Sequence, residues 1–235
     1  MIEIKNVTKK YGDKIAIKDL NFDIKDGEIF GFIGHNGAGK TTMIKSLIGI
    51  LNFDDGDILI NNKSIKEDPI ACKLEMAYVP DNPDLYENMT AIDFINFVCD
   101  MYETSVEIRK ENILKYSKMF EMENKLNDDI SSFSHGMKQK VSLIAALSHN
   151  PKILIMDEPF VGLDPKAVFD VKSVMKEMTK EGKTIFFSTH ILDVAEKLCD
   201  RVAIIKNGNI IKIGKMKDIK GDSSLEEVFL ELEDK

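Results

Sequence analysis

The feature that most constrains the fold is a glycine-rich loop placed between a strand and a helix. The phosphate-binding loop pattern Gly-x4-Gly-Lys-Ser/Thr is matched by Gly34-His35-Asn36-Gly37-Ala38-Gly39-Lys40-Thr41. The apolar run 29–33 precedes it, and a stretch of helical character, 42–51, follows. Glycines leave the backbone N–H groups free to face phosphate oxygens at the start of a helix. This setting predicts an α/β fold with a site for a nucleoside triphosphate.

The end of this loop supplies three expected ligands. Lys40 is expected to reach the β- and γ-phosphates, and the Thr41 hydroxyl to bind Mg²⁺. Thr42 completes the nucleotide-binding set on the first turn of the helix. The other interpretation, a glycine-rich turn without a ligand, is disfavoured by the flanking strand and helix.

Charge and hydropathy exclude several other classes. The net charge of −8 argues against a general nucleic-acid binder, whose affinity comes from contacts to phosphates. No apolar run approaches the ~20 residues of a membrane span, and Met1 leads directly into a strand-like segment. We therefore expect a cytoplasmic chain. Cys72, Cys99 and Cys199 lack metal-ligand spacing, which is typical of free thiols in a reducing compartment.

The hydrophobic periodicity changes twice along the chain. Residues 1–26 alternate between apolar and polar, which predicts half-buried antiparallel strands. Residues 84–150 have helical spacing and no strong strand signal, and α/β order returns after residue 150. We expect one α/β domain, 1–235. Its core, 1–83 and 151–235, would have a mostly parallel sheet flanked by helices and an N-terminal antiparallel β subdomain, while 84–150 would form a helical lobe.

Several later segments have clear local signals. The apolar runs 153–156 and 184–187 are typical of parallel strands buried on both faces, and 166–179 has one apolar helical face. The pair Asn207-Gly208 predicts a hairpin between two strands. Capping-box patterns at 90–93 and 224–227 predict the starts of two helices.

Two carboxylates and a histidine follow the buried strands. Asp157 and Glu158 come at the end of the strand 153–156, where ligands bind in open α/β sheets. Asp157 is expected to hold Mg²⁺ and Glu158 to orient and deprotonate water, the alternative being an acidic surface loop. His190 follows the next strand and is expected near the same phosphate, although a structural histidine is the commoner interpretation of such a residue alone.

A second small-residue motif precedes a helix in the middle of the chain. Ser134 is followed by His135, Gly136 and an apolar helical stretch, so it is a natural N-cap. A helix start with small residues is also an anion site. In isolation the segment would predict only a capped helix.

Over essentially its whole length, this sequence resembles the nucleotide-binding subunits of ATP-binding-cassette (ABC) transporters. The resemblance implies a P-loop NTPase core in which 34–41 is the Walker A loop and 153–158 is Walker B, with Glu158 as catalytic base. It also implies that Tyr11 stacks on adenine, that Leu163-Asp164 is the D-loop and that His190 is the switch histidine. Ser134 and Gly136 would belong to the signature motif that contacts ATP.

Two positions depart from the family pattern. The signature reads Phe133-Ser134-His135-Gly136-Met137 where the family usually has Leu-Ser-Gly-Gly-Gln. This variant looks like the branch that serves bacterial export permeases for drugs, lipids, peptides or ions. Asp81 stands where the family has the Q-loop glutamine, and we expect it to offer an oxygen to Mg²⁺ or to water.

The resemblance also implies a mechanism and partners. Two copies, or one copy and a homologous ATPase subunit, would enclose ATP and Mg²⁺ head-to-tail, with Ser134 acting on the partner's nucleotide. Hydrolysis to ADP and phosphate would then drive separate integral-membrane permease subunits, which would hold the chain at the inner face of the cell membrane. Pro83, Leu85 and Tyr86 are the expected permease contacts, the alternative being a loop that packs on its own lobe.

Three other functions fit these motifs less well. A soluble ABC ATPase of translation or nucleic-acid repair is the nearest, but those resemble tandem cassettes or carry long coiled-coil insertions. A small-molecule P-loop kinase would have no use for the serine-glycine motif. A nucleotide-binding regulator without hydrolysis is disfavoured by Glu158.

Overall fold

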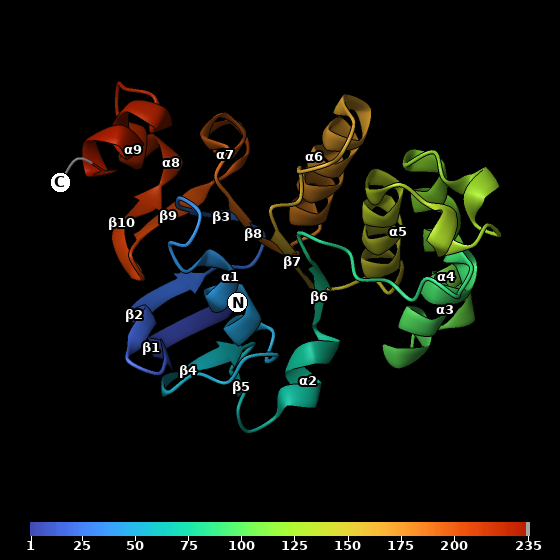
Figure 1. Ribbon diagram of the computed structural model, residues 1–235, viewed down its shortest axis with the longest axis horizontal. Helices are drawn as coiled ribbons and strands as arrows, with labels where there is room; N and C mark the ends of the chain where they lie inside the picture. Colours follow the sequence, from blue (N-terminus) through green and yellow to red (C-terminus); the bar gives the residue numbers. More distant parts are fainter. Residues whose placement is uncertain (234–235) are drawn as a thin grey trace.

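Two β-sheets lie on either side of the helix that follows the glycine-rich loop (Figure 1). The computed structural model describes residues 1–233. The smaller sheet is antiparallel, in the order β2-β1-β4-β5, and consists of β1 (Ile2–Tyr11), β2 (Lys14–Ile24), β4 (Asp55–Ile60) and β5 (Lys63–Ser64). The larger sheet has the order β10-β9-β3-β8-β7-β6.

The larger sheet is parallel except at one edge. Its parallel strands are β3 (Ile29–Ile33), β6 (Met76–Val79), β7 (Ile153–Asp157), β8 (Thr184–Thr189) and β9 (Arg201–Lys206). The edge strand β10 (Asn209–Lys215) runs antiparallel to β9. The carboxyl ends of β3, β7 and β8 therefore meet at one side of the sheet, as the positions of the sequence motifs require.

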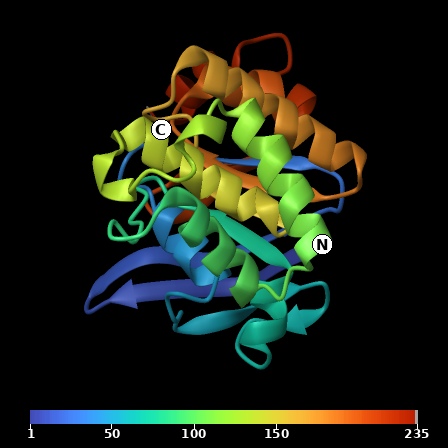
Figure 2. The ribbon, with the colours of Figure 1, turned by 90° about the vertical axis from the view of Figure 1, so that its right-hand side faces the viewer.

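Helices cover the faces of the sheets and their ends. They are α1 (Lys40–Leu47), α2 (Pro69–Leu74), α3 (Ala91–Met101), α4 (Val106–Met119), α5 (His135–Ser148), α6 (Pro165–Lys180), α7 (Leu192–Leu198), α8 (Met216–Lys220) and α9 (Leu225–Glu233), with 3-10 turns η1 (Glu123–Lys125) and η2 (Ile130–Ser132). In Figure 2 the helices of residues 91–148 face the viewer, above the antiparallel strands. Within residues 1–233, no helix combines the length and the apolar content that crossing a bilayer demands.

The core has two parts, one on each face of the larger sheet. The first joins the antiparallel sheet and α1 to β3 and β8, with Phe22, Phe30 and Phe32 stacked at its centre. The second continues from the opposite face of the sheet into α3, α4 and α5 without a break. Burying each such side chain is worth about 1.5–3 kcal/mol. The helices of 84–150 are thus held against the sheet by a shared core, and their separation as a lobe stays a prediction.

Most predicted elements are present, with small shifts at their ends. Thr90 caps α3 and accepts a hydrogen bond from the Asp93 N–H at 3.2 Å. At α9, Ser224 and Glu227 exchange two hydrogen bonds, which makes a full capping box. The helix after the glycine-rich loop begins at Lys40, and the chain leaves it through Gly49 with a φ of 65°. Helix α2 and strand β6 were not anticipated from the sequence.

Candidate nucleotide-binding site

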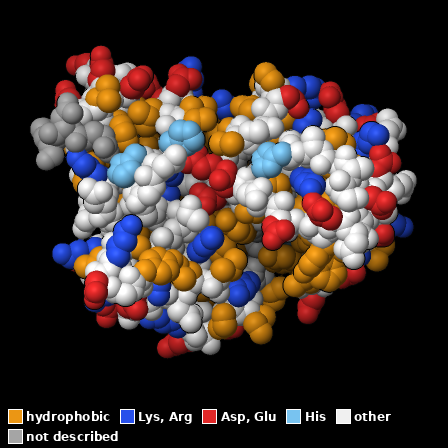
Figure 3. All heavy atoms as spheres, viewed as in Figure 1, with side chains coloured by type: hydrophobic (Ala, Val, Ile, Leu, Met, Phe, Trp, Pro, Cys, Tyr) orange, Lys and Arg blue, Asp and Glu red, His pale blue; other side chains and the backbone are white. Residues whose placement is uncertain are grey.

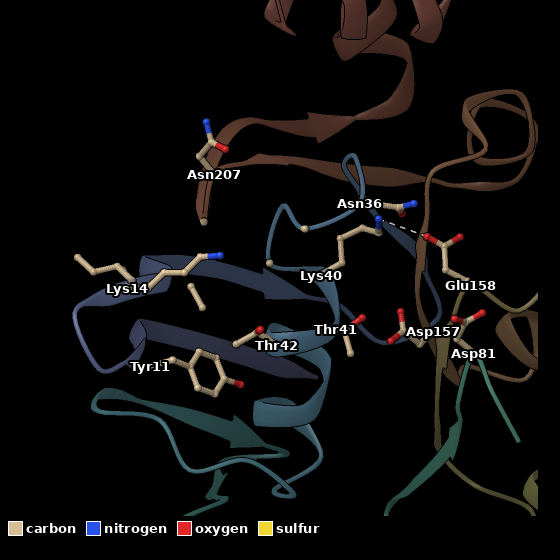
Figure 4. Close-up of a pocket in the computed structure, with 15 residues that line it drawn as sticks. Tyr11, Lys14, Asn36, Lys40, Thr41, Thr42, Asp81, Asp157, Glu158 and Asn207 are labelled. Atoms are coloured by element: carbon tan, nitrogen blue, oxygen red, sulfur yellow. Dashed lines mark ion pairs between the residues drawn. The ribbon is translucent and has the colours of Figure 1, made fainter. Parts of the chain in front are cut away.

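A cavity of about 490 Å³ opens between the carboxyl ends of the parallel strands and the antiparallel sheet (Figure 4). Most of the predicted site residues line it: Tyr11, Asn36, Gly37, Gly39, Lys40, Thr41, Thr42, Asp81, Asp157 and Glu158. In Figure 3, acidic side chains gather in a hollow at the middle of this face, with lysines and arginines around it. Predicted residues from four segments far apart in the sequence thus share one cavity.

The glycine-rich loop curls around the ammonium group of Lys40. Lys40 Nζ donates to the carbonyl oxygens of Gly34 at 2.7 Å and His35 at 3.3 Å, and its side chain is only 6% exposed. A Cβ on Gly34 would lie 2.5 Å from the Ile205 carbonyl oxygen. Gly39 has a φ of 114°, and a Cβ there would lie 2.8 Å from the Ala16 oxygen. Glycine is therefore required at both positions by the approach of neighbouring backbone.

The remaining loop residues shape the turn. Ala38 is fully buried, and its N–H donates to the His35 carbonyl at 3.2 Å. His35 Nδ1 lies 2.7 Å from the Asn36 carbonyl oxygen. Gly34, His35 and Ala38, which the sequence also placed in the nucleotide site, do not line the cavity.

Glu158 connects the glycine-rich loop to the end of β8 through contacts with Lys40 and His190. Lys40 Nζ lies 3.3 Å from Glu158 Oε1, and His190 Nδ1 lies 3.0 Å from Glu158 Oε2. Glu158 is 11% exposed, and His190 is half exposed just beyond β8. The structure therefore places the histidine beside the carboxylate that is expected to activate water.

Asp157 and Glu158 are fixed by β8, the strand next to their own. Ser188 Oγ donates to Asp157 Oδ1, and the Glu158 N–H donates to both the hydroxyl and the carbonyl oxygen of Ser188. Glu158 itself has a φ of 48°. Sequence reasoning missed Ser188, because nothing in the local pattern showed which residue of β8 faces Asp157.

Asp81 brings a third carboxylate to the same place. It follows β6, and Figure 4 shows it beside Asp157, with Thr41 on the other side. Partial burial raises the pKa of Asp81, and the negative charges of Asp157 and Glu158 raise it further. A cation between these groups would remove that repulsion.

The donor set here fits Mg²⁺ bound together with a nucleotide. Residues 1–233 contain no group of three His, Cys, Asp or Glu side chains arranged to hold a metal. Mg²⁺ usually keeps several waters and binds one or two carboxylates plus substrate phosphates. Thr41, Asp157 and Asp81 offer hard oxygen atoms of this kind next to the phosphate-binding loop.

Five further residues complete the cavity wall: Lys14, Ile15, Ala16, Asn207 and Gly208. The Asn207-Gly208 turn of the β9–β10 hairpin packs against the loop, since the Gly208 N–H donates to the Ala38 carbonyl at 2.9 Å. The sequence predicted this turn, but its place in the site depends on a contact between strands distant in the chain.

Ser134 and Gly136 lie outside the cavity. Ser134 caps α5, as predicted, and its exposed hydroxyl accepts a hydrogen bond from the Met137 N–H at 3.3 Å. A Cβ on Gly136 would lie 2.8 Å from the Gly162 carbonyl oxygen, so the helix start touches the segment after Glu158. Farther along α5, the buried Gln139 donates to the Pro80 carbonyl at 3.3 Å, which joins this helix to the segment that carries Asp81.

The three expected permease contacts differ in exposure. Pro83 and Leu85 are buried within this chain, as the alternative interpretation expects. Tyr86 is 57% exposed and makes edge contacts with Phe94 and Phe97 of α3. Only Tyr86 of the three presents a large accessible surface.

Known proteins resemble this chain in both sequence and fold. Residues 17–161 match the family model described as ABC transporter. The ABC-type transporter ATP-binding protein EcsA of Bacillus subtilis (strain 168) is 35% identical over 237 residues, covering 99% of this chain and 96% of that protein. The linearmycin resistance ATP-binding protein LnrL of the same organism is 34% identical over 219 residues, covering 93% and 70%.

Two solved structures have a similar fold. The structure of an ATP binding subunit of an ABC transporter has a TM-score of 0.96 at 34% identity, with 99% of each chain covered. A dimeric ATP-binding cassette in a post-hydrolysis state, bound to ADP and phosphate, has a TM-score of 0.83 at 28% identity, covering 92% of this chain and 99% of that one.

The fold and the site define a P-loop ATPase, and the predicted α/β fold class is confirmed. This chain belongs to the ABC transporter family, as an ATP-binding subunit. Its activity is the ATP hydrolysis that energises a membrane transporter, and a soluble role in translation or repair is not favoured.

Proposed function

We propose that ATP binds with its triphosphate in the 34–41 loop, and that Glu158 activates the water that attacks it. One observation carries this proposal: Lys40 Nζ and the His190 ring both contact the Glu158 carboxylate, beside Asp157 and Thr41. Tyr11 lines the far end of the same cavity, half exposed, where it would stack on adenine. The loop N–H groups and the start of α1 would meet the phosphate charge.

The chemistry assigned to each side chain follows from its position. Thr41, Asp157 and Asp81 would hold Mg²⁺, which would neutralise charge on the phosphate oxygens. Lys40 would exchange its contact with Glu158 for the β- and γ-phosphates, which would free that carboxylate. Glu158 would then take a proton from water as the water oxygen bonds to the γ-phosphorus and the bond to ADP breaks.

His190 is proposed to hold Glu158 during this step. Its ring nitrogen lies 3.0 Å from Oε2, and its backbone N–H donates to the same oxygen at 3.3 Å. Two contacts to one carboxylate oxygen leave the other oxygen to face the phosphate-binding loop. The histidine would also reach the γ-phosphate as it leaves.

We further propose that a complete site needs two chains. Ser134 is exposed and outside the cavity, so it is free to meet a nucleotide held by a second copy or a homologous subunit. Dimeric cassettes among the solved structures support this arrangement. The start of α5 and the Ser134 hydroxyl would add donors to the partner's triphosphate.

The partner that moves cargo is proposed to be a set of integral-membrane permease subunits, with this chain at the inner face of the cell membrane. Relatives in this family are named for linearmycin resistance, Nod factor export and methionine import. We favour export because of the altered signature Phe133–Met137.

The test is ATP hydrolysis by purified wild type and Glu158→Gln, with dimerisation followed by gel filtration. Glu158→Gln should bind ATP, lose most hydrolysis and accumulate as a nucleotide-bound dimer. Adding Ser134→Arg should abolish that dimer, because the larger, positively charged arginine side chain would occupy the place of the partner's triphosphate. Hydrolysis at the wild-type rate in Glu158→Gln would remove this carboxylate from the role of base.

A further inference from the structure

The Ser188 hydroxyl lies between the two carboxylate residues of the site. We propose that Ser188 is a positioning residue for ATP hydrolysis: its hydroxyl orients the Asp157 carboxylate and fixes the backbone from which Glu158 projects. This inference rests on the roles proposed above for Asp157 and Glu158. Ser188 does not line the cavity, so it would act through these two residues.

The strand register brings Ser188 to Asp157. Asp157 of β7 pairs directly with Ser188 of β8 in the parallel ladder, and both residues are buried, at 3% and 0% exposure. The Ser188 hydroxyl donates to Asp157 Oδ1. A hydrogen bond to an ionised carboxylate is stronger and shorter than one between neutral groups. It therefore holds the carboxylate plane, and leaves the second oxygen of Asp157 to turn toward the cavity.

The same hydroxyl also receives a hydrogen bond from the backbone of Glu158. The Glu158 N–H lies 3.2 Å from Ser188 Oγ and 3.2 Å from the Ser188 carbonyl oxygen. A serine hydroxyl has one proton to donate and lone pairs to accept. Because the Glu158 N–H approaches the oxygen, the proton is directed to Asp157. One side chain thus sets the relative position of both carboxylate residues.

The backbone at Glu158 needs such support. Its φ of 48° lies in the left-handed region, which is uncommon for residues other than glycine. Pro159 follows, and a proline favours an extended conformation in the residue before it. Conformations of this kind persist where neighbouring groups hold them. The contacts from Ser188 to the Glu158 N–H, and from His190 to its carboxylate, hold this one.

A hydroxyl that only satisfied the packing of β8 would behave differently. Its removal would lower the thermal stability and leave the metal and the chemical step unaffected. Thr184, in the same strand, is such a residue: it is 1% exposed, and its hydroxyl donates to the Lys25 carbonyl at 3.3 Å, away from the site. Thr184→Val is therefore a matched control for the loss of a buried hydroxyl.

The experiment compares wild type, Ser188→Ala, Ser188→Thr and Thr184→Val. Two readouts are made: kcat for ATP with Mg²⁺, and the affinity for Mn²⁺ of the ADP-bound protein, measured by electron paramagnetic resonance. Ser188→Ala should lower kcat and the Mn²⁺ affinity by roughly tenfold each, the worth of one hydrogen bond to a charged group. Ser188→Thr keeps the hydroxyl and should restore both, while Thr184→Val should match wild type in both.

Several results would overturn this inference. Wild-type kcat and Mn²⁺ affinity in folded Ser188→Ala would refute it, as would equal losses in Thr184→Val. If Ser188→Ala does not fold, Ser188→Cys replaces it, because the thiol has a similar shape and donates only weakly. Ser188→Ala at the wild-type rate beside an inactive Glu158→Gln would refute the role of Ser188 alone. An active Glu158→Gln would instead refute the proposed function.

Discussion

The buried histidine His149 should make this protein less stable in mildly acidic solution. His149 ends α5, is 9% exposed, and stacks on Tyr102 with ring centroids 3.7 Å apart and an interplanar angle of 10°. Burial lowers the pKa of His149 from 6.5 to about 4, because the charged ring would lose its hydration. His149 therefore binds a proton less readily in the folded protein than in the unfolded chain.

The sign and size of the effect follow from these two pKa values. Below pH 6.5 the unfolded chain binds a proton at His149 that the folded state does not, so the free energy of unfolding falls as the pH falls. The contribution is complete above pH 6.5 and is lost progressively down to about pH 4. Between pH 7 and pH 5 the loss from this residue is about 2 kcal/mol, and by pH 4 it is about 3 kcal/mol.

Urea unfolding followed by circular dichroism from pH 7.5 to pH 4.5 would measure this. His149→Phe keeps a flat ring against Tyr102 and cannot titrate, so its curve reports all other groups. The free energy of unfolding of wild type minus that of His149→Phe should fall by about 2 kcal/mol between pH 7 and pH 5. A difference that stays constant across this range would refute the reasoning, because it would mean that His149 titrates equally in both states.

Three other perturbations test the site itself. Gly39→Ala should abolish ATP binding in an equilibrium dialysis assay and destabilise the loop by more than about 1 kcal/mol. The reason is that φ at Gly39 is 114° and a Cβ there would lie 2.8 Å from the Ala16 oxygen. Binding of ATP at wild-type affinity would contradict this. Asp81→Asn should raise the unfolding temperature of the metal-free protein at pH 7.5, since burial and repulsion from two neighbouring carboxylates raise the pKa of Asp81. An unchanged unfolding temperature in EDTA would count against this repulsion. Tyr11→Ala should weaken ATP binding roughly tenfold, as loss of one base stack predicts, and Tyr11→Trp should retain the binding. Equal ATP affinities of Tyr11→Ala and wild type in fluorescence titrations would exclude stacking.

The local sequence was enough to predict the parts of the site that lie within one segment. The phosphate-binding loop is defined by glycines at 34 and 39, whose backbone cannot carry a side chain there. The helix caps at Thr90, Ser134 and Ser224 form hydrogen bonds within three residues, so they too could be predicted from neighbours alone. The strand before Asp157 was clear because a strand buried on both faces is a continuous apolar run.

Residues whose position depends on strand order could not be found in this way. Gly208 reaches the cavity because β9 pairs with β3, and Ser188 reaches Asp157 because β8 pairs with β7 in one register. Neither pairing leaves a signal in the residues themselves. The same holds for Pro83 and Leu85, which the sequence offered as partner contacts and the structure buries.

The sequence by itself determined the chemistry available to this protein: a loop for phosphates, two carboxylates after a buried strand, and a histidine after another. These depend on residue type and short spacing, which act within a few residues along the chain. The tertiary structure decided which of these groups meet, since the sheet order β9-β3-β8-β7 brings separate strand ends to one edge. It also decided that Ser134 lies apart from the cavity, because α5 directs its start to the surface, where another chain can approach.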